Sequence, residues 1–275
     1  MTSFSSLQRR EDIFIAGENL YDEYVWVMSM GNFEGLFDHA ILGIPATRKF
    51  CQLRYAEFHC VVEGKITQTG LFVDWIGLML QAGVYPLPPA TGANNVTPGP
   101  QTQDGIHLGD SPPQAAQETL DLLERMIADL NELNESGAMS SPEGLLERTW
   151  AKDMLWYGPA GIGTTYTIDR YREQHQLPFR SQLADKKFNG HVCRFAEGNY
   201  ACFFGWPNLS NTPIGGWLGL PGGKVNAQMQ VVDVYRREGD KLKENWVIID
   251  LPYWLSQQGL DVFKRSAGIF GTSPG

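Results

Sequence analysis

NWVIIDLPYWLSQQG, residues 245–259, carries one aspartate at the end of an apolar, strand-like run, and TGLFVDWIGLMLQAG, residues 69–83, repeats this pattern. A shift of 176 residues superimposes the two stretches without a gap, so that Asp74 lies on Asp250. A buried carboxylate destabilises a protein unless it is paired, protonated or used in function. The fold and the function must therefore account for these two aspartates.

The same shift extends the match toward the N-terminus. It superimposes LGIPATRK (42–49) on LGLPGGKV (218–225), and it places Glu57 in register with Asp233. The identities gather at turn glycines, a proline and the two aspartates. This clustering indicates an internal duplication; the alternative is chance similarity between two β-rich segments.

Each repeated unit is predicted to be a β-hairpin. LRYAEFHCVV (53–62) and MQVVDVYRR (229–237) are rich in β-branched and aromatic residues, and each is followed by a glycine-containing turn and a second apolar run. The second strand of each hairpin would then end at its aspartate.

A segment rich in proline and glycine, residues 86–113, divides the chain. It holds seven of the sixteen prolines and has no hydrophobic periodicity, so we expect a linker or a long surface loop. Residues 114–275 contain apolar residues at helical spacing, and TIDRYREQHQLPFRSQLA (167–184) predicts a further helix. Residues 1–85 have no room for such helices and are expected to form a truncated, mostly β copy.

Composition limits the classes of function. The formal net charge of −9 argues against a nucleic-acid partner, and no apolar run approaches the roughly 18 residues needed to span a membrane. Four cysteines without CxxC spacing favour reduced thiols over disulfides or a zinc site, and no other metal or cofactor motif is found. We expect a cytoplasmic protein without metal or cofactor.

Three stretches resemble the SnoaL-like polyketide (ester) cyclase family of the nuclear transport factor 2-like superfamily. They are DMLWYGPAGIGTTYTIDRYREQH (153–175), GWPNLSNTPIGGWLGLPGGKV (205–225) and DVYRREGDKLKENWVIIDLPYWLSQQG (233–259). The resemblance implies an α+β fold of two cones, each a bent antiparallel sheet with helices, the first cone being truncated. It also implies an apolar pocket and sheets that pair, either as a pseudo-dimer within the chain or as a homodimer.

The resemblance further implies an activity. Family members close rings by intramolecular aldol condensation without a cofactor, using an aspartate on the last strand as acid/base. That aspartate would be Asp250, with Asp74 as its counterpart in the truncated copy.

The residues themselves leave two roles open for Asp250. It shares a strand face with Trp246 and Ile248, and if that face lines the cone, desolvation would raise its pKa and suit it to proton transfer. It could also cap the following helical turn, and the two roles do not exclude one another. For Asp74, capping or an interface role is favoured. His191, in a predicted strand, is a further acid/base candidate, with a structural or surface role as the alternative.

Several aromatic side chains are candidates for lining a ligand pocket, although each could equally belong to the core. They are Trp156, Tyr157, Tyr166, Trp206, Trp217, Tyr235 and Trp246. The function expected is binding of a small apolar carbonyl compound, with cyclase, isomerase or lyase chemistry. The alternative is a non-catalytic ligand-binding or assembly module of the same fold, in which both aspartates are caps.

Overall fold

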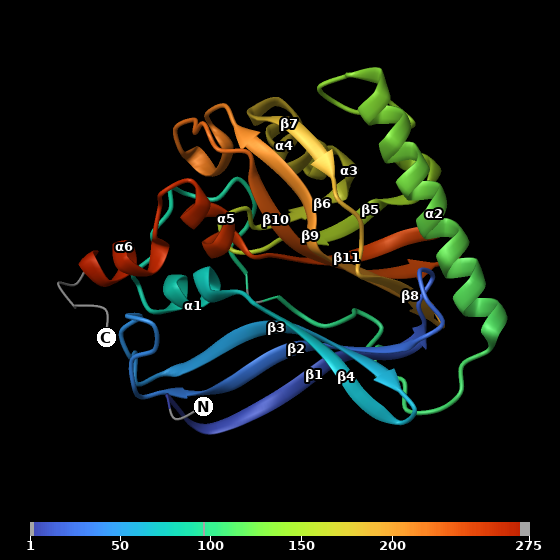
Figure 1. Ribbon diagram of the computed structural model, residues 1–275, viewed down its shortest axis with the longest axis horizontal. Coiled ribbons are helices and arrows are strands. Elements are labelled where there is room, and N and C mark those ends of the chain that lie inside the picture. Colours follow the sequence, from blue (N-terminus) through green and yellow to red (C-terminus); the bar gives the residue numbers. More distant parts are fainter. Residues whose placement is uncertain (1–2, 96, 270–275) are drawn as a thin grey trace.

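The computed structural model describes residues 3–95 and 97–269, and it contains two curved β-sheets (Figure 1). The first sheet is antiparallel, with strand order β1-β2-β3-β4. Its strands are β1 (Phe4–Glu18), β2 (Val25–Phe37), β3 (Phe50–Val62) and β4 (Lys65–Val73). A short helix, α1 (Trp75–Gln81), follows β4, so the first part is mostly β, as predicted.

The second sheet has the order β6-β5-β11-β10-β9-β7, with β8 also paired to β9. Its strands are β5 (Trp150–Tyr157), β6 (Thr164–Tyr166), β7 (Leu183–Phe188), β8 (Cys193–Glu197), β9 (Tyr200–Pro213), β10 (Ala227–Glu238) and β11 (Lys241–Ile249). Neighbouring strands are antiparallel except β5 and β11, which are parallel.

The helices lie mainly in the second part, which confirms the predicted α+β class. They are α2 (Pro113–Ser136), α3 (Thr167–Tyr171), α4 (Leu177–Gln182), α5 (Leu251–Gln257) and α6 (Val262–Ile269), with short 3-10 turns at Leu146–Arg148 and Trp217–Gly219. Among the described residues, none of these helices is long and apolar enough to cross a membrane.

The single helix predicted over residues 167–184 contains a π-helical turn, Arg172–Gln176. The physical reason lies in Pro178, which has no amide hydrogen to donate to the carbonyl four residues earlier and whose ring crowds that carbonyl. The carbonyl of Gln174 accepts a hydrogen bond from the Thr91 hydroxyl instead, at 2.7 Å. The segment is therefore one continuous helical stretch from Thr167 to Gln182, as predicted, but its middle turn is π-helical.

The repeated sequence stretches fold alike. Lys65–Val73 (β4) and Lys241–Ile249 (β11) have equivalent bounds, as do the helices α1 and α5 that follow them. In the first copy, the Gln81 side chain bonds both the amide and the carbonyl of Gln52, at 2.9 and 2.6 Å. The antiparallel pairing of β3 with β4 and of β10 with β11 confirms the predicted hairpins in both parts.

In the second copy, Gln257 bonds the amide and carbonyl of Gln228 in the same way, both at 2.9 Å. The helices α1 and α5 contact each other at one end of the molecule (Figure 1).

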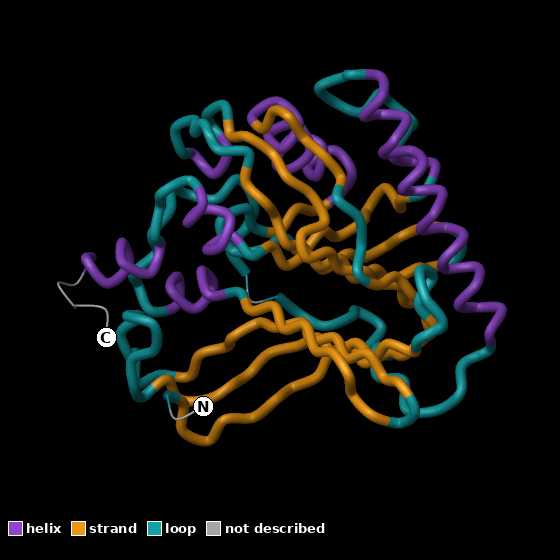
Figure 2. Tube along the Cα trace, in the orientation of Figure 1, coloured by secondary structure: helices purple, strands orange, loops and turns teal. Residues whose placement is uncertain are grey.

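The two sheets pack face to face and share a buried core between them (Figure 2). Phe204 of β9 lies at its centre, with its ring 4.6 Å from that of Phe58 and 5.6 Å from those of Trp26 and Phe72. We call this the inter-sheet core. The other face of the second sheet packs against α2 and the α3–α4 segment.

Residues 86–95 and 97–112 contain no helix or strand before α2 begins, and they are held to both sheets. Ala93 forms a β-bridge with Thr164. The Phe14 amide donates to the carbonyl of Gly105 at 2.8 Å.

Candidate functional site

A cavity of about 670 Å³, which we call the main cavity, lies between the second sheet and the helices that cover it. Its floor is formed by β10 and β11, and its helical wall by α2 and the α3–α4 segment. The floor residues are Met229, Val231, Asp233, Tyr235, Asn245, Val247 and Ile249, and the helical wall includes Met126, Leu130, Tyr171, His175 and Phe179.

Strand alternation explains why Asp233 enters this cavity. Successive side chains of a strand point to opposite faces of the sheet. Val232 and Val234 lie in the inter-sheet core, so Val231, Asp233 and Tyr235 point to the helix-covered face and line the cavity.

The Asp233 carboxylate is held by two neighbours. Oδ1 accepts hydrogen bonds from the Tyr235 hydroxyl at 3.1 Å and from Nδ2 of Asn245 at 3.3 Å. Burial raises the pKa of Asp233 to about 6, although these two hydrogen bonds oppose part of the shift. A carboxyl group with this pKa can both accept and return a proton near neutral pH.

Sequence reasoning missed Asp233 as a site residue. Two signals could have identified it: it interrupts the apolar strand VVDVY, and it alternates in phase with Tyr235, a predicted pocket residue. The missing information was which face of the sheet would be covered by helices.

The helical wall contributes a stack of rings around His175. Its imidazole lies 4.0 Å from the Trp156 ring at an angle of 20°, with Tyr171 at 5.4 Å and Phe179 at 5.8 Å. Burial lowers the pKa of His175 to about 3, so this histidine is neutral near pH 7. Sequence reasoning did not single it out.

His191 also lines the main cavity. Its ring stacks on Phe203 at 4.0 Å, and its Nδ1 accepts a hydrogen bond from Arg194 at 2.9 Å. Burial and the Arg194 charge lower the pKa of His191 to about 3. Of the predicted site residues, Trp156, Tyr235 and His191 line the same cavity as Asp233.

Three of the predicted pocket aromatics are core residues. Tyr157 and Trp246 stack at 5.4 Å in the inter-sheet core, where Trp246 Nε1 donates to the carbonyl of Pro98 at 2.9 Å. Trp217 packs edge-on against Trp254 at 4.8 Å.

The remaining two predicted pocket aromatics, Tyr166 and Trp206, are partly exposed. Tyr166 is 45% exposed and accepts a hydrogen bond from Asn95 at 2.7 Å. Trp206 is 49% exposed and lies edge-on to Phe72.

Asp250 caps α5. Its Oδ1 accepts a hydrogen bond from the Tyr253 amide at 3.0 Å, and burial raises its pKa. The face that it was expected to share with Trp246 and Ile248 is the inter-sheet core, whereas Val247 and Ile249 line the cavity. The capping alternative for Asp250 is confirmed, and its side chain does not line the main cavity.

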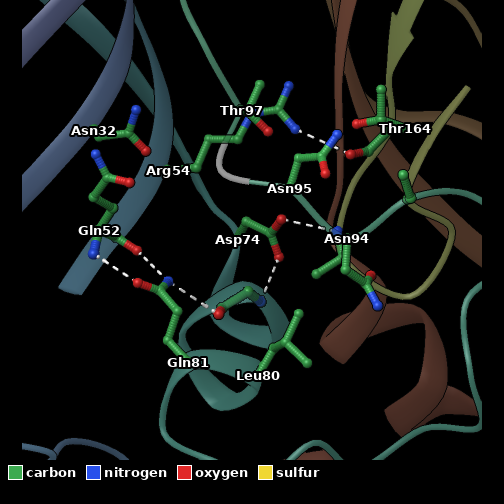
Figure 3. Close-up of a pocket in the computed structure, with 15 residues that line it drawn as sticks. Asn32, Gln52, Arg54, Asp74, Leu80, Gln81, Asn94, Asn95, Thr97 and Thr164 are labelled. Atoms are coloured by element: carbon green, nitrogen blue, oxygen red, sulfur yellow. Dashed lines mark hydrogen bonds between the residues drawn. The ribbon is translucent and has the colours of Figure 1, made fainter. Parts of the chain in front are cut away.

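Asp74 caps α1 and also joins the two parts of the chain. Oδ1 accepts from the Gly77 amide and Oδ2 from the Ala160 amide, both at 2.9 Å (Figure 3). Because Ala160 belongs to the second part, the carboxylate serves the cap and the interface at once. This agrees with the favoured interpretation of Asp74.

Asp74 lies in a second, smaller pocket of about 210 Å³, which is lined mostly by polar side chains (Figure 3). Arg54 is only 7% exposed there and donates to the carbonyls of Gly158 at 3.2 Å and Tyr157 at 3.1 Å. Burial lowers the pKa of Arg54 to about 10. Over residues 3–95 and 97–269, no group of three His, Cys, Asp or Glu side chains could hold a metal ion.

Comparison with known proteins gives similarity at the level of structure. No family model and no curated protein matches the chain. Similar solved structures include a nuclear transport factor 2-like protein from Burkholderia xenovorans, 16% identical, with a TM-score of 0.36, covering 52% of this chain and 97% of that one.

Two further similar structures have named activities. One is a candidate SnoaL-like polyketide cyclase from Jannaschia, 12% identical, with a TM-score of 0.42, covering 55% of this chain and 97% of that one. Another is an epoxide hydrolase from Mycobacterium tuberculosis, 11% identical, with a TM-score of 0.36, covering 54% and 95%. The chain is thus similar, over about half of its length, to solved nuclear transport factor 2-like and SnoaL-like proteins.

Proposed function

We propose that the main cavity binds a small, mostly apolar carbonyl compound and that Asp233 transfers a proton at the carbon next to the carbonyl group. The observation that carries this proposal is a carboxyl group with a pKa raised to about 6 that opens into a cavity of about 670 Å³. Perturbed carboxyl groups in such cavities are candidates for acid/base catalysis.

The composition of the cavity supports an apolar, flat ligand. Rings of Trp150, Trp156, Phe179 and Phe203 line it together with aliphatic side chains such as Val231 and Val247, and polar side chains, Asp233 and Asn245 among them, lie between these apolar groups. A ligand with an aromatic or polyketide-like body would replace water against these rings, and the polar groups would orient it.

The chemistry follows from the protonation state of Asp233. As a carboxylate it takes the proton from the carbon next to the carbonyl, which leaves an enolate, and as the acid it returns the proton. If the enolate attacks a second carbonyl of the same molecule, the product is a ring; if the proton returns elsewhere, the product is an isomer. The acid/base role that the resemblance implied for Asp250 is thus proposed here for Asp233.

A second function is favoured by a specific observation. Asp74 and Asp250 both cap helices, which is the arrangement expected of a non-catalytic ligand-binding or assembly module. In this alternative the main cavity binds the same class of ligand without turnover.

We also propose that residues 1–85 and 114–275 descend from one duplicated unit and pack as an intramolecular pseudo-dimer, joined by residues 86–113. The matching hydrogen bonds of Gln81 and Gln257 support this proposal. Cys51, Cys60, Cys193 and Cys202 are all free and buried, which supports a reducing, cytoplasmic environment. A homodimer of whole chains would be an additional level of assembly.

Deuterium exchange into 2-tetralone, an aromatic ketone with acidic protons next to its carbonyl, tests the catalytic proposal. Proton NMR in D₂O follows the exchange with and without the protein. The wild-type protein should accelerate exchange, and Asp233→Asn should remove about 100-fold or more of that acceleration. Asp250→Asn is the matched control and should keep it.

Each other outcome identifies an alternative. If Asp250→Asn abolishes exchange and Asp233→Asn does not, the role implied by the resemblance holds for Asp250. If 2-tetralone binds in the main cavity without any acceleration, the non-catalytic module is favoured.

A further inference from the structure

The π-helical turn presents two polar side chains to the main cavity, His175 and Gln176, and the ring of His175 is the one that stacks on Trp156. The turn arises because Pro178 cannot continue the hydrogen-bond ladder of the preceding helix. Single π-helical turns are rare and frequently occur at functional sites. Here the turn places His175 on the helical wall, facing the sheet that carries Asp233.

The ring of His175 is fixed on its faces but not through its nitrogen atoms. Trp156 stacks on it at 4.0 Å, and Tyr171 and Phe179 lie within 6 Å. Nδ1 is buried and has no hydrogen-bond partner. A buried polar atom without a partner costs about 1–3 kcal/mol, so such an atom in a native site calls for an explanation.

The surroundings of Nδ1 determine where the ring proton lies. A buried N–H without an acceptor is rarer in proteins than an acceptor without a donor. The neutral ring is therefore expected to keep Nδ1 bare and to carry its proton on Nε2. Because His175 lines the main cavity and its Nδ1 is buried, Nε2–H is the donor that this ring can offer to a ligand there.

We propose that Nε2–H of His175 donates a hydrogen bond to the carbonyl oxygen of the ligand in the main cavity. This inference rests on the proposed function, since it assigns the group that binds the carbonyl oxygen while Asp233 acts on the neighbouring carbon. When the carbon–hydrogen bond breaks, its proton moves to Asp233 and its electron pair forms the enolate. The negative charge then develops on the oxygen bound by His175, which keeps its own proton throughout.

A neutral histidine suits this role. Burial lowers the pKa of His175 to about 3, so near pH 7 the ring is a donor without a positive charge. It therefore forms no ion pair with Asp233 that would lower the pKa of that carboxyl and weaken it as a base. The aromatic stack holds the donor in place before the ligand arrives.

A pair of probes tests the inference through binding rather than turnover. 2-Acetylnaphthalene carries a carbonyl oxygen, and 2-ethylnaphthalene has a similar shape without it. Dissociation constants are measured for both with the wild-type protein and with His175→Phe, which keeps a ring to stack on Trp156. We expect His175→Phe to weaken binding of the ketone about 3- to 10-fold relative to the hydrocarbon.

Two variants serve as controls. His191→Phe removes the other cavity histidine, whose Nδ1 is occupied by Arg194, and should leave the ratio of the two dissociation constants unchanged. Asp233→Asn should also keep the ratio, so that failure of the acid/base proposal and failure of this inference are distinguishable. An equal effect of His175→Phe on both probes would assign His175 a purely structural role and overturn the inference.

Nitrogen-15 NMR of the wild-type protein provides a test that does not depend on a variant's folding. The His175 ring should be neutral with its proton on Nε2 from pH 5 to 8, and the ketone should shift the Nε2 resonance more than the hydrocarbon does. A proton on Nδ1, or no response of His175 to the ketone, would contradict the inference. Absence of binding by both probes would contradict it as well, because the cavity would then not admit this class of ligand.

Discussion

Glu57 of β3 and Asp233 of β10 occupy equivalent positions in the two hairpins, yet their surroundings are opposite. Glu57 accepts a hydrogen bond from Arg9 at 2.7 Å and lies 3.6 Å from His59. Among the described residues, Asp233 accepts side-chain hydrogen bonds only from the neutral groups of Tyr235 and Asn245, and burial raises its pKa.

The difference comes from what covers each sheet. The outer face of the second sheet is covered by α2 and the α3–α4 segment, which enclose the main cavity. The first part has only the short helix α1 after its last strand. The same strand position therefore yields a solvent-facing ion pair in one part and a proton-transfer candidate in the other.

The largest change in stability is expected from a substitution in the core between the two sheets, which tests whether the two parts unfold together. Phe204→Ala removes the ring at the centre of the inter-sheet core and should lower the free energy of unfolding by about 3–5 kcal/mol. Denaturant unfolding followed by fluorescence and by circular dichroism should still give one shared transition. Phe188→Ala, at a residue that is 63% exposed, should change stability by less than about 0.5 kcal/mol. Two separate transitions in the wild-type protein would show that the parts fold independently.

The sequence predicted the features that depend on local signals. Glycine-containing turns, strand alternation and a capping aspartate identified both hairpins and the helices α1 and α5, because each of these signals acts within a few residues. The π-helical turn was missed, although Pro178 is visible in the sequence, because a proline does not reveal how the chain will accommodate it.

The candidate site was harder to predict because alternation identifies two faces of a strand but not what covers each of them. Trp246 and Tyr157 were expected in a pocket and lie in the inter-sheet core, since the first part of the chain covers that face. Asp233 lies on the opposite face, and its importance depends on helices far away in the sequence.

Stability should depend on pH through Asp233. The pKa of this carboxyl in the folded state is about 6, above the ordinary value of about 3.9. The folded protein binds this proton more tightly than the unfolded chain does. Stability should therefore fall as the pH rises from about 4 to about 6, by roughly 2 kcal/mol, and the loss is complete above that window. Asp233→Asn cannot ionise and should be more stable than the wild type at pH 8, with a flatter profile.

Glu57→Gln is the matched control, because it removes a charge that is paired with Arg9 on a solvent-facing surface. It should lower stability by less than about 1 kcal/mol, which is an effect of the opposite sign. Thermal unfolding from pH 4 to 8 measures both variants. If Asp233→Asn is instead less stable than the wild type at pH 8, the hydrogen bonds of the Asp233 carboxylate stabilise the folded protein by more than its desolvation destabilises it.

The two caps should differ in strength. Asp250→Ala removes one hydrogen bond, to the Tyr253 amide, and should cost about 1 kcal/mol. Asp74→Ala removes the bonds to Gly77 and Ala160 and should cost about 2 kcal/mol. Urea unfolding measures the difference, and equal losses would mean that the bond across the two parts adds nothing to stability.

The smallest difference in stability between matched variants is expected where the two parts are most alike. Gln81 and Gln257 each bond the amide and the carbonyl of a glutamine at the start of the preceding hairpin, at 2.6–2.9 Å. Gln81→Ala and Gln257→Ala should therefore each lower the free energy of unfolding by about 1 kcal/mol and agree within about 0.5 kcal/mol. A clear difference between them in urea unfolding would mean that similar hydrogen bonds contribute unequally, because the covered second sheet holds its hairpin more rigidly than the uncovered first sheet does.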